Sequence, residues 1–174
     1  MKARNIPIAV IVAGAILAAG CTSTPLSSPS ASASLQPASG SNVSGRLTFT
    51  QVGEAVRITG EITGHKPGPK GFHIHEKGDC SAPDAMSAGG HFNPNKARHG
   101  ASPLGGHAGD MGNLDFDANG RAVVYMTVRG ISLTRDASNN IVGRAVVVHM
   151  QPDDLKTDPT GNAGGRAACG GITG

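Results

Sequence analysis

The chain has 174 residues, of which 38% are hydrophobic and only 3% are aromatic, with one tyrosine and no tryptophan. Fifteen Lys and Arg stand against twelve Asp and Glu, and two of the positive charges, Lys2 and Arg4, belong to the extreme N-terminus. The remainder is nearly neutral and has neither a basic run nor interleaved aromatic residues, which excludes a nucleic-acid-binding surface.

The first twenty residues have the pattern of a signal peptide. Lys2 and Arg4 precede an apolar run over residues 6–19, which is too short to span a bilayer but suits an export signal. The small residues before Cys21 resemble the lipobox of bacterial lipoproteins, in which the cysteine is lipidated and becomes the first mature residue. Residues 1–20 are therefore expected to be a signal peptide of the lipoprotein type. Ordinary cleavage that leaves a soluble protein is the alternative.

Residues 21–30 begin with the lipidated cysteine and, being rich in Ser, Pro and Thr, predict a flexible tether, whereas residues 31–174 predict one domain. Within the domain, short apolar segments are separated by Gly, Pro, Asn and Asp, which is typical of β-strands. The predicted strands cover residues 43–51, 55–62, 71–76, 121–128 and 144–150, with a weak candidate over residues 31–35. No segment has helical periodicity over about ten residues, so we expect an all-β sandwich or flattened barrel with functional loops.

Three cysteines are an odd number, and an exported protein seldom keeps a free thiol. If Cys21 carries lipid, Cys80 and Cys169 are left, and an oxidising compartment favours a disulfide between them. In the chain-entropy account, closing a loop of about 90 residues stabilises the fold by at most about 4 kcal/mol. Two buried free thiols are the alternative.

Six of the seven histidines form a widely spaced series that an aspartate completes: His73, His75, His91, His99, His107, His149 and Asp110. Neutral imidazole is the commonest side-chain metal ligand, so this series predicts a metal centre. His73 and His75 alternate along a predicted strand, which puts both rings on one face. Seven candidates are more than one ion binds. Three histidines plus a carboxylate suit zinc and four histidines suit copper, which requires one imidazole to bridge both ions.

Four segments resemble the signatures of copper/zinc superoxide dismutases: residues 71–76 (GFHIHE), 87–94 (SAGGHFNP), 107–113 (HAGDMGN) and 161–170 (GNAGGRAACG). The resemblance runs from about residue 31 to the C-terminus. It implies an eight-stranded Greek-key sandwich or flattened barrel with long metal-binding and active-site loops. It also makes residues 31–35 the first strand.

The resemblance further implies roles for individual residues. Copper would be bound by His73, His75, His91 and His149, and zinc by His91, His99, His107 and Asp110, with His91 as the bridging imidazolate. Asp153 would link one copper ligand to one zinc ligand, Arg166 would dock an anionic substrate beside copper, and Thr160 would form the other wall of the channel.

Two features stand apart from this pattern. The segment between His149 and Arg166 is short, and the family's substrate-steering lysine and glutamates cannot be placed in it, although Lys156 is a candidate. Steering changes the association rate and not the chemistry. His65 lies outside the metal set and is interpreted as a loop histidine without a role.

The reaction that the resemblance implies is the dismutation of superoxide to dioxygen and hydrogen peroxide by copper cycling between Cu(II) and Cu(I), with zinc structural. His91 would deliver a proton and Arg166 would attract the anion. A metal carrier without activity and a sandwich module that binds only zinc remain as alternatives.

The N-terminal pattern gives an expected location. We expect a protein of the periplasm or cell envelope that protects the envelope from superoxide and contacts the membrane only through its lipid anchor. Thr22 instead of Asp after Cys21 favours the outer membrane. Monomer and homodimer are both open, because exported members of the family include both.

Overall fold

The computed structural model describes residues 28–38, 40–100 and 105–174, which form eight β-strands that pair antiparallel. The strands are β1 Ser30–Pro37, β2 Ser44–Val52, β3 Ala55–Thr63, β4 Gly68–His75, β5 Asp110–Phe116, β6 Arg121–Arg129, β7 Ala145–His149 and β8 Arg166–Gly171. The only helical segment within these described residues is a single 3-10 turn, η1, Met86–Ala88. The expected all-β class is confirmed.

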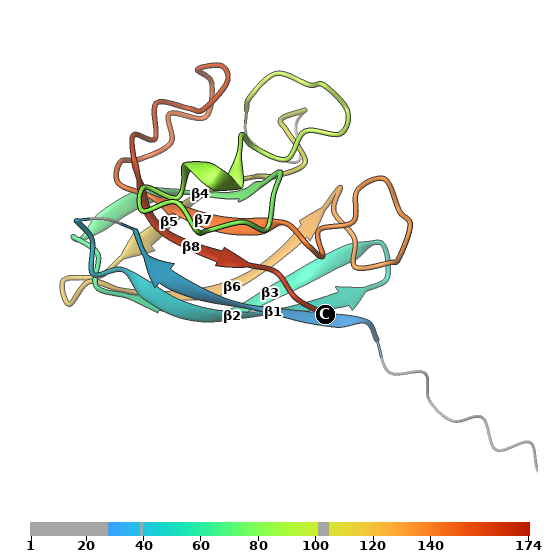
Figure 1. Cartoon of the computed structure of the whole chain (residues 1–174), viewed down its shortest axis with the longest axis horizontal. Coiled ribbons are helices and arrows are strands. Elements are labelled where there is room, and N and C mark those ends of the chain that lie inside the picture. The colour runs from blue at the N-terminus through green and yellow to red at the C-terminus, as the bar shows by residue number, and fades with distance from the viewer. Residues whose placement is uncertain (1–27, 39, 101–104) are drawn as a thin grey trace, which may run out of the picture.

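The strands follow the order β5-β4-β7-β8-β1-β2-β3-β6. Some strands pair with their neighbours in the chain, and others pair with strands distant in the chain, as in a Greek key. Figure 1 shows two layers, with β5, β4, β7 and β8 lying over β1, β2, β3 and β6. β5 and β6 stand at the two ends of the order, and the barrel is nearly closed between them. The flattened eight-stranded barrel implied by the resemblance is therefore confirmed.

Side chains that alternate along the strands fill the space between the layers. Leu47 and Phe49 on β2 and Val56 and Ile58 on β3 are fully buried. β7 is buried at every position, because the loop after β4 packs over its outer face while the core covers its inner face. The strand that ends in a candidate ligand is thus enclosed on both sides.

Two strands were not predicted from the residue pattern. β5 contains Gly112 and Asn113 and has buried apolar residues only near its end, and β8 consists mostly of Ala and Gly. Both depend on their neighbours. A Cβ on Gly170 of β8 would lie 2.8 Å from the carbonyl oxygen of Ser34 on β1, so only glycine lets these strands approach.

Two long connections lie on the outside of the layer that contains β4 and β7 (Figure 1). One includes residues 76–100 and 105–109, between β4 and β5, and the other covers residues 150–165, between β7 and β8. A disulfide between Cys80 and Cys169 joins the first of these loops to β8, with the Cα atoms 5.7 Å apart. The predicted disulfide is confirmed.

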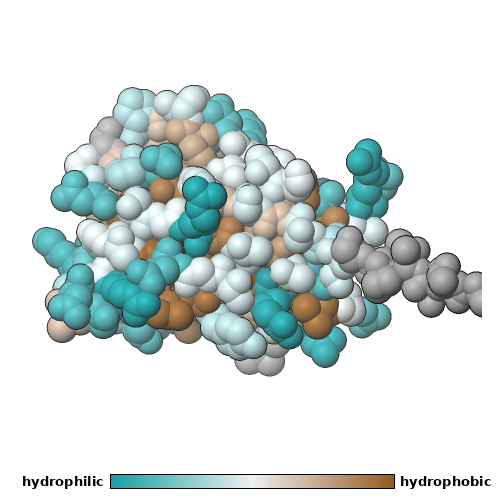
Figure 2. Space-filling model, turned by 90° about the horizontal axis from the view of Figure 1, so that it is seen from below, coloured by the Kyte–Doolittle hydropathy of each residue, from teal (hydrophilic) through white to brown (hydrophobic). Residues whose placement is uncertain are grey.

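The predicted signal peptide, Cys21 and the tether up to residue 27 lie outside the described residues. Within the described ranges, no helix is long and apolar enough to cross a membrane. Figure 2 shows one face of the molecule as mainly polar or intermediate in hydropathy, with small separate groups of apolar side chains. On β6, the exposed apolar residues Val123 and Tyr125 alternate with buried Ala122 and Val124.

Candidate metal centre

Four buried histidine rings converge over β4 and β7, and we call them the first set. His73 and His75 lie at alternate positions at the end of β4, and His149 is the last residue of β7, the neighbouring strand. His91 comes from the loop, through a backbone bridge between His75 and His91. One nitrogen from each ring lies within 4.8 Å of the others, which is close enough for one ion to bind all four.

A second set lies beside the first and shares His91 with it. It consists of buried residues whose ligand atoms also lie within 4.8 Å of one another: His91, His99, His107 and Asp110. Nδ1 of His91 is 2.8 Å from Asp110 Oδ1, and Nδ1 of His99 is 3.0 Å from Oδ2. Nδ1 of His107 is 3.2 Å from Oδ1. Ligand atoms around a tetrahedral zinc ion lie about 3.3 Å apart, so this set has the dimensions of a zinc site.

Several buried ring nitrogens in the two sets have no hydrogen-bond partner: His73 Nδ1, His91 Nε2, His99 Nδ1 and His107 Nδ1. Leaving one such atom unsatisfied costs about 1–3 kcal/mol, so a group of four calls for another partner. The short distances from His99 and His107 to Asp110 lack hydrogen-bond geometry, as expected for ligands that face a common ion. The residues of both sets therefore fit bound metal ions.

Backbone acceptors outside the first set hold the outer nitrogens of two of its rings. His75 Nδ1 donates to the Gly89 carbonyl oxygen at 2.9 Å, and His149 Nδ1 donates to that of Gly164 at 3.2 Å. These bonds keep a proton on Nδ1 and leave Nε2 free for a metal. The two Nε2 atoms lie 3.3 Å apart, on the inner side of the set.

Burial keeps three rings of the first set neutral. Desolvation lowers the pKa of His73 to about 4, that of His75 to about 2 and that of His149 to about 3. Burial alone would raise the pKa of Asp110, but hydrogen bonds from the His91 ring and from backbone N–H groups lower it. At pH 7 these three rings are therefore neutral and Asp110 is ionised, which are the forms that bind metal.

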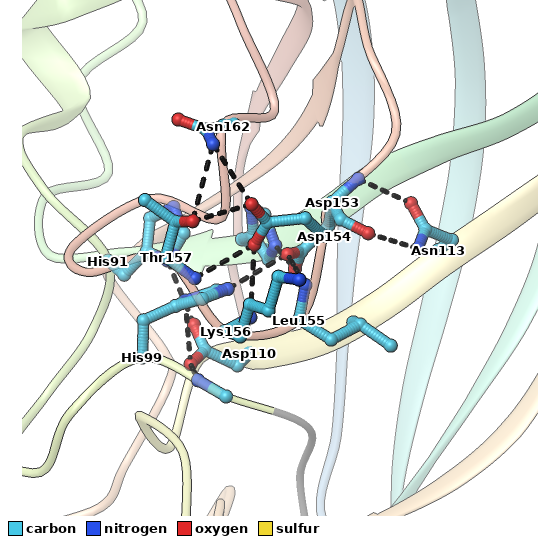
Figure 3. Close-up of polar contacts among 12 residues, drawn as sticks. His91, His99, Asp110, Asn113, Asp153, Asp154, Leu155, Lys156, Thr157 and Asn162 are labelled. Carbon is cyan, nitrogen blue, oxygen red and sulfur yellow. Dashed lines mark hydrogen bonds and ion pairs between the residues drawn. The ribbon is translucent and has the colours of Figure 1, made fainter.

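Asp153 joins the two sets through their outer nitrogens (Figure 3). Its Oδ2 accepts a hydrogen bond from His73 Nε2 at 2.7 Å, and its Oδ1 accepts one from His99 Nε2 at 2.9 Å. Burial would raise the pKa of this carboxyl, but the two ring hydrogen bonds hold it well below its usual range. One carboxylate therefore orients a ring of each set.

Two residues that the sequence analysis did not single out hold Asp153 in place. Asn113 of β5 pairs with its backbone: Nδ2 donates to the Asp153 carbonyl oxygen at 2.9 Å, and Oδ1 accepts from its N–H at 2.8 Å (Figure 3). Gly161 has a φ of 62°, and a Cβ there would overlap Asp153 Oδ1 and crowd His99 Nε2. Both residues lie inside family-like segments, which is the one signal that could have found them.

The loop between β7 and β8 is held together by hydrogen bonds to Asp154, the residue after Asp153. Its carboxylate accepts hydrogen bonds from the Thr157 hydroxyl, from the backbone N–H groups of Lys156 and Thr157, and from the Asn162 amide (Figure 3). The Thr157 hydroxyl contributes most to lowering the pKa of Asp154 to about 2. Lys156 and Thr160 are exposed on this loop, and their part in a substrate channel stays a prediction.

Arg166, the first residue of β8, is held beside the first set by the loop after β4. Its Nη1 donates to the Ala85 carbonyl oxygen and its Nη2 to that of Gly89, both at 2.5 Å. The Gly89 oxygen also accepts from the His75 ring, so the guanidinium and one ring of the first set share an anchor. The Arg166 charge adds to the lowering of the His75 pKa, as expected for a cation next to the cluster.

The chain matches the family model described as copper/zinc superoxide dismutase (SODC) over residues 43–172. It is also similar to the clock protein EA4, known from a crystal structure, with 42% sequence identity and a TM-score of 0.75. That similarity covers 85% of this chain and 96% of the other. The region matched by the family model contains both sets, Asp153 and Arg166.

Proposed function

Because the chain belongs to the copper/zinc superoxide dismutase family, and is thus an oxidoreductase of that type, we propose that it dismutates superoxide at the first set. We assign copper to His73, His75, His91 and His149 and zinc to His91, His99, His107 and Asp110. The observation that carries this assignment is the group of buried ring nitrogens, in both sets, that lack a hydrogen-bond partner.

The reaction converts two superoxide ions and two protons into dioxygen and hydrogen peroxide. Copper at the first set would exchange one electron with each superoxide in turn, while zinc, which has no redox chemistry, would supply a fixed charge at the second set. The chain itself has to attract a small anion, hold the rings in place and deliver a proton.

Arg166 attracts and orients the anion. A guanidinium stays charged at every physiological pH and presents its N–H groups in a planar fork. Two of its nitrogens are tied to backbone carbonyl oxygens of the neighbouring loop, which fixes the charge beside the first set. A fixed positive charge in a cleft raises the local concentration of anions and hence the association rate.

We assign proton delivery to Nε2 of His91. This atom is buried and has no hydrogen-bond partner, whereas Nδ1 of the same ring is held 2.8 Å from Asp110. A ring that is fixed through one nitrogen can take up and release a proton at the other without changing its place. The same ring thereby serves both sets.

The decisive experiment is an assay of superoxide removal on protein loaded with copper and zinc, with both metals counted per chain. One copper and one zinc per chain together with turnover are expected. Copper without turnover would favour a metal carrier, and zinc alone would favour a zinc-binding module.

Replacing His149 with Ala tests the copper assignment. Loss of one of four ligands should abolish turnover and copper binding, whereas zinc binding should survive, because His149 belongs to the first set alone. Circular dichroism checks that the β-structure is intact. A His149→Ala protein with full activity would contradict the assignment.

The proposed location is the cell envelope, with Cys21 lipidated and the protein anchored to the outer membrane. The export-type N-terminus and the disulfide support it, because disulfides persist in oxidising compartments. Labelling with a radioactive fatty acid tests the anchor. Label in the native chain and none in Cys21→Ser, with release of that variant from the membrane fraction, is expected; equal labelling of both would refute it.

A further inference from the structure

His65 lies in the short connection between β3 and β4, ahead of His73 in the chain but outside both sets. The backbone N–H groups of Gly64 and His65 both donate to the Gly120 carbonyl oxygen, at 2.9 and 3.4 Å. Gly120 has a φ of 73°, and a Cβ there would overlap the His65 carbonyl oxygen. The connection is therefore fixed against the turn between β5 and β6, which defines the position of the His65 backbone.

The ring of His65 is directed toward the end of β7. It packs against Phe116 of β5 with the ring centroids 5.0 Å apart. Its Nε2 lies 3.1 Å from the backbone carbonyl oxygen of His149, 84 residues further along the chain. Nδ1 lies 3.2 Å from the Lys66 carbonyl oxygen, so both ring nitrogens face acceptors. In the tautomer with the proton on Nε2, the ring donates a hydrogen bond to the main chain of a first-set ligand.

The main chain at His149 is held less regularly by its neighbouring strand than the rest of β7, so an additional hydrogen bond there helps to fix its position. The pairing of β7 with β8 shifts its register between Val148 and His149, so the ladder is irregular at the ligand. The ring of His149 is held by the Gly164 carbonyl oxygen at 3.2 Å. The bond from His65 holds its backbone, so ring and backbone have separate supports.

We propose that His65 is a positioning residue for the first set: its ring fixes the main chain of His149 and thereby the place of His149 Nε2. His65 touches neither metal nor substrate. The inference rests on the proposed function for the identity of the metal, copper, but its content is the geometry of one ligand. It gives a role to the histidine that the sequence left without one.

Two substitutions separate the hydrogen bond from the packing. His65→Phe keeps an aromatic ring against Phe116 but has no donor, whereas His65→Gln restores an N–H donor on a side chain of similar reach. Lys66→Gln, at the exposed neighbouring position, is the matched control. Copper affinity is measured by competition with a chelator, the copper environment by electron paramagnetic resonance, and zinc affinity on copper-free protein.

Losing one hydrogen bond behind the ligand should weaken copper binding about three- to tenfold in His65→Phe. Its copper resonance spectrum should also change. Zinc affinity should stay within about twofold of the native value, because His149 is not in the second set. His65→Gln and Lys66→Gln should both resemble the native protein in all three measurements.

Native copper affinity and an unchanged spectrum in His65→Phe would overturn the inference. So would equal losses of copper and zinc affinity, because they would indicate a general role in folding. If His65→Phe does not fold, His65→Asn is compared with His65→Gln, since the shorter amide cannot reach the carbonyl oxygen; equal copper affinities would then overturn it. Failure of the proposed function gives a different result, namely copper-loaded native protein that does not remove superoxide.

Discussion

The two nitrogens of His91 face different sets, and this division makes the residue irreplaceable. Nδ1 lies 2.8 Å from Asp110, while Nε2 is buried on the side of the first set without a partner. A carboxylate or a thiolate can bridge two ions, but neither has two opposed nitrogens held in one rigid ring. The two sets thus share this one side chain.

The absence of a side chain at Gly161 leaves room for the Asp153 carboxylate that joins the two sets. Gly161→Ala should lower zinc affinity about 10- to 100-fold, because the added methyl group displaces the carboxylate that orients His99. Gly53→Ala is the matched control, since Gly53 has a similar φ of 57° but open space around it. Titration against a chromophoric chelator measures both variants. Equal zinc affinities in the two would refute the argument.

Arg166 makes a second prediction at this scale. Arg166→Gln should lower kcat/KM for superoxide about tenfold or more and flatten its dependence on ionic strength, because the attraction that salt screens is gone. The kcat/KM of Arg166→Lys should lie between those of Arg166→Gln and the native chain. Lysine keeps the charge but cannot bond both Ala85 and Gly89 in a planar fork. Both variants should keep their metals. A rate for Arg166→Gln equal to that of the native chain would exclude the role.

At the scale of elements, the sequence predicts those parts of the fold that depend on their own side chains. β3, β6 and β7 were found because their apolar, largely β-branched residues mark a strand. β5 was missed because Asp, Gly and Asn interrupt its apolar residues, and β8 because Ala and Gly leave no such pattern. Neighbouring strands hold both in place. β1 was a weak candidate from its own residues, and the family resemblance made it the first strand.

In the candidate site, too, the sequence predicts the residues that act through their own side-chain chemistry but not those that act through contacts with distant segments. The residues of the two sets could be predicted to lie together, because few side-chain types bind copper or zinc and their spacing is distinctive. The roles of Asn113, Gly161 and His65 could not be predicted from their side-chain chemistry, since each acts on a backbone atom or by leaving space. Such contacts exist only once segments distant in the sequence have come together.

The disulfide joins two elements, the loop after β4 and the strand β8, and its removal should affect both stability and turnover. Replacing Cys80 and Cys169 together with Ser avoids a free thiol and should lower the free energy of unfolding by about 2–4 kcal/mol. Turnover per bound copper should also fall, because the loop that the disulfide joins to β8 carries the two acceptors of Arg166. Denaturant titration and metal-normalised assays measure the two effects. A loss of stability with full turnover per copper would separate the disulfide from the arginine.

At the scale of the whole molecule, the barrel and the loops contribute differently to the two sets. Three residues of the first set, His73, His75 and His149, lie on the strands β4 and β7. In the second set, His99 and His107 lie in the long loop before β5. The first set is therefore shaped largely by the barrel, whereas a metal in the second set would also order its loop.

Removing the metals should therefore affect the loop more than the barrel. A ligand present at about a thousand times its Kd stabilises the folded state by about 4 kcal/mol, so a chelator should lower Tm clearly. Calorimetry measures the shift. Hydrogen exchange should rise in residues 76–100 and change little in β4 and β7, which are enclosed by the core and the loop. Uniform exchange in both regions would contradict this division.

The carboxylate of Asp153 touches one ring of each set, and this has a consequence for how the protein fills with metal. Whatever factor zinc contributes to the affinity for copper, copper must contribute to the affinity for zinc, because the four states of occupancy form a closed thermodynamic cycle. When that coupling is favourable, half-filled molecules are the rare species at intermediate metal supply. The population then divides mainly into empty and complete centres, whichever metal arrives first.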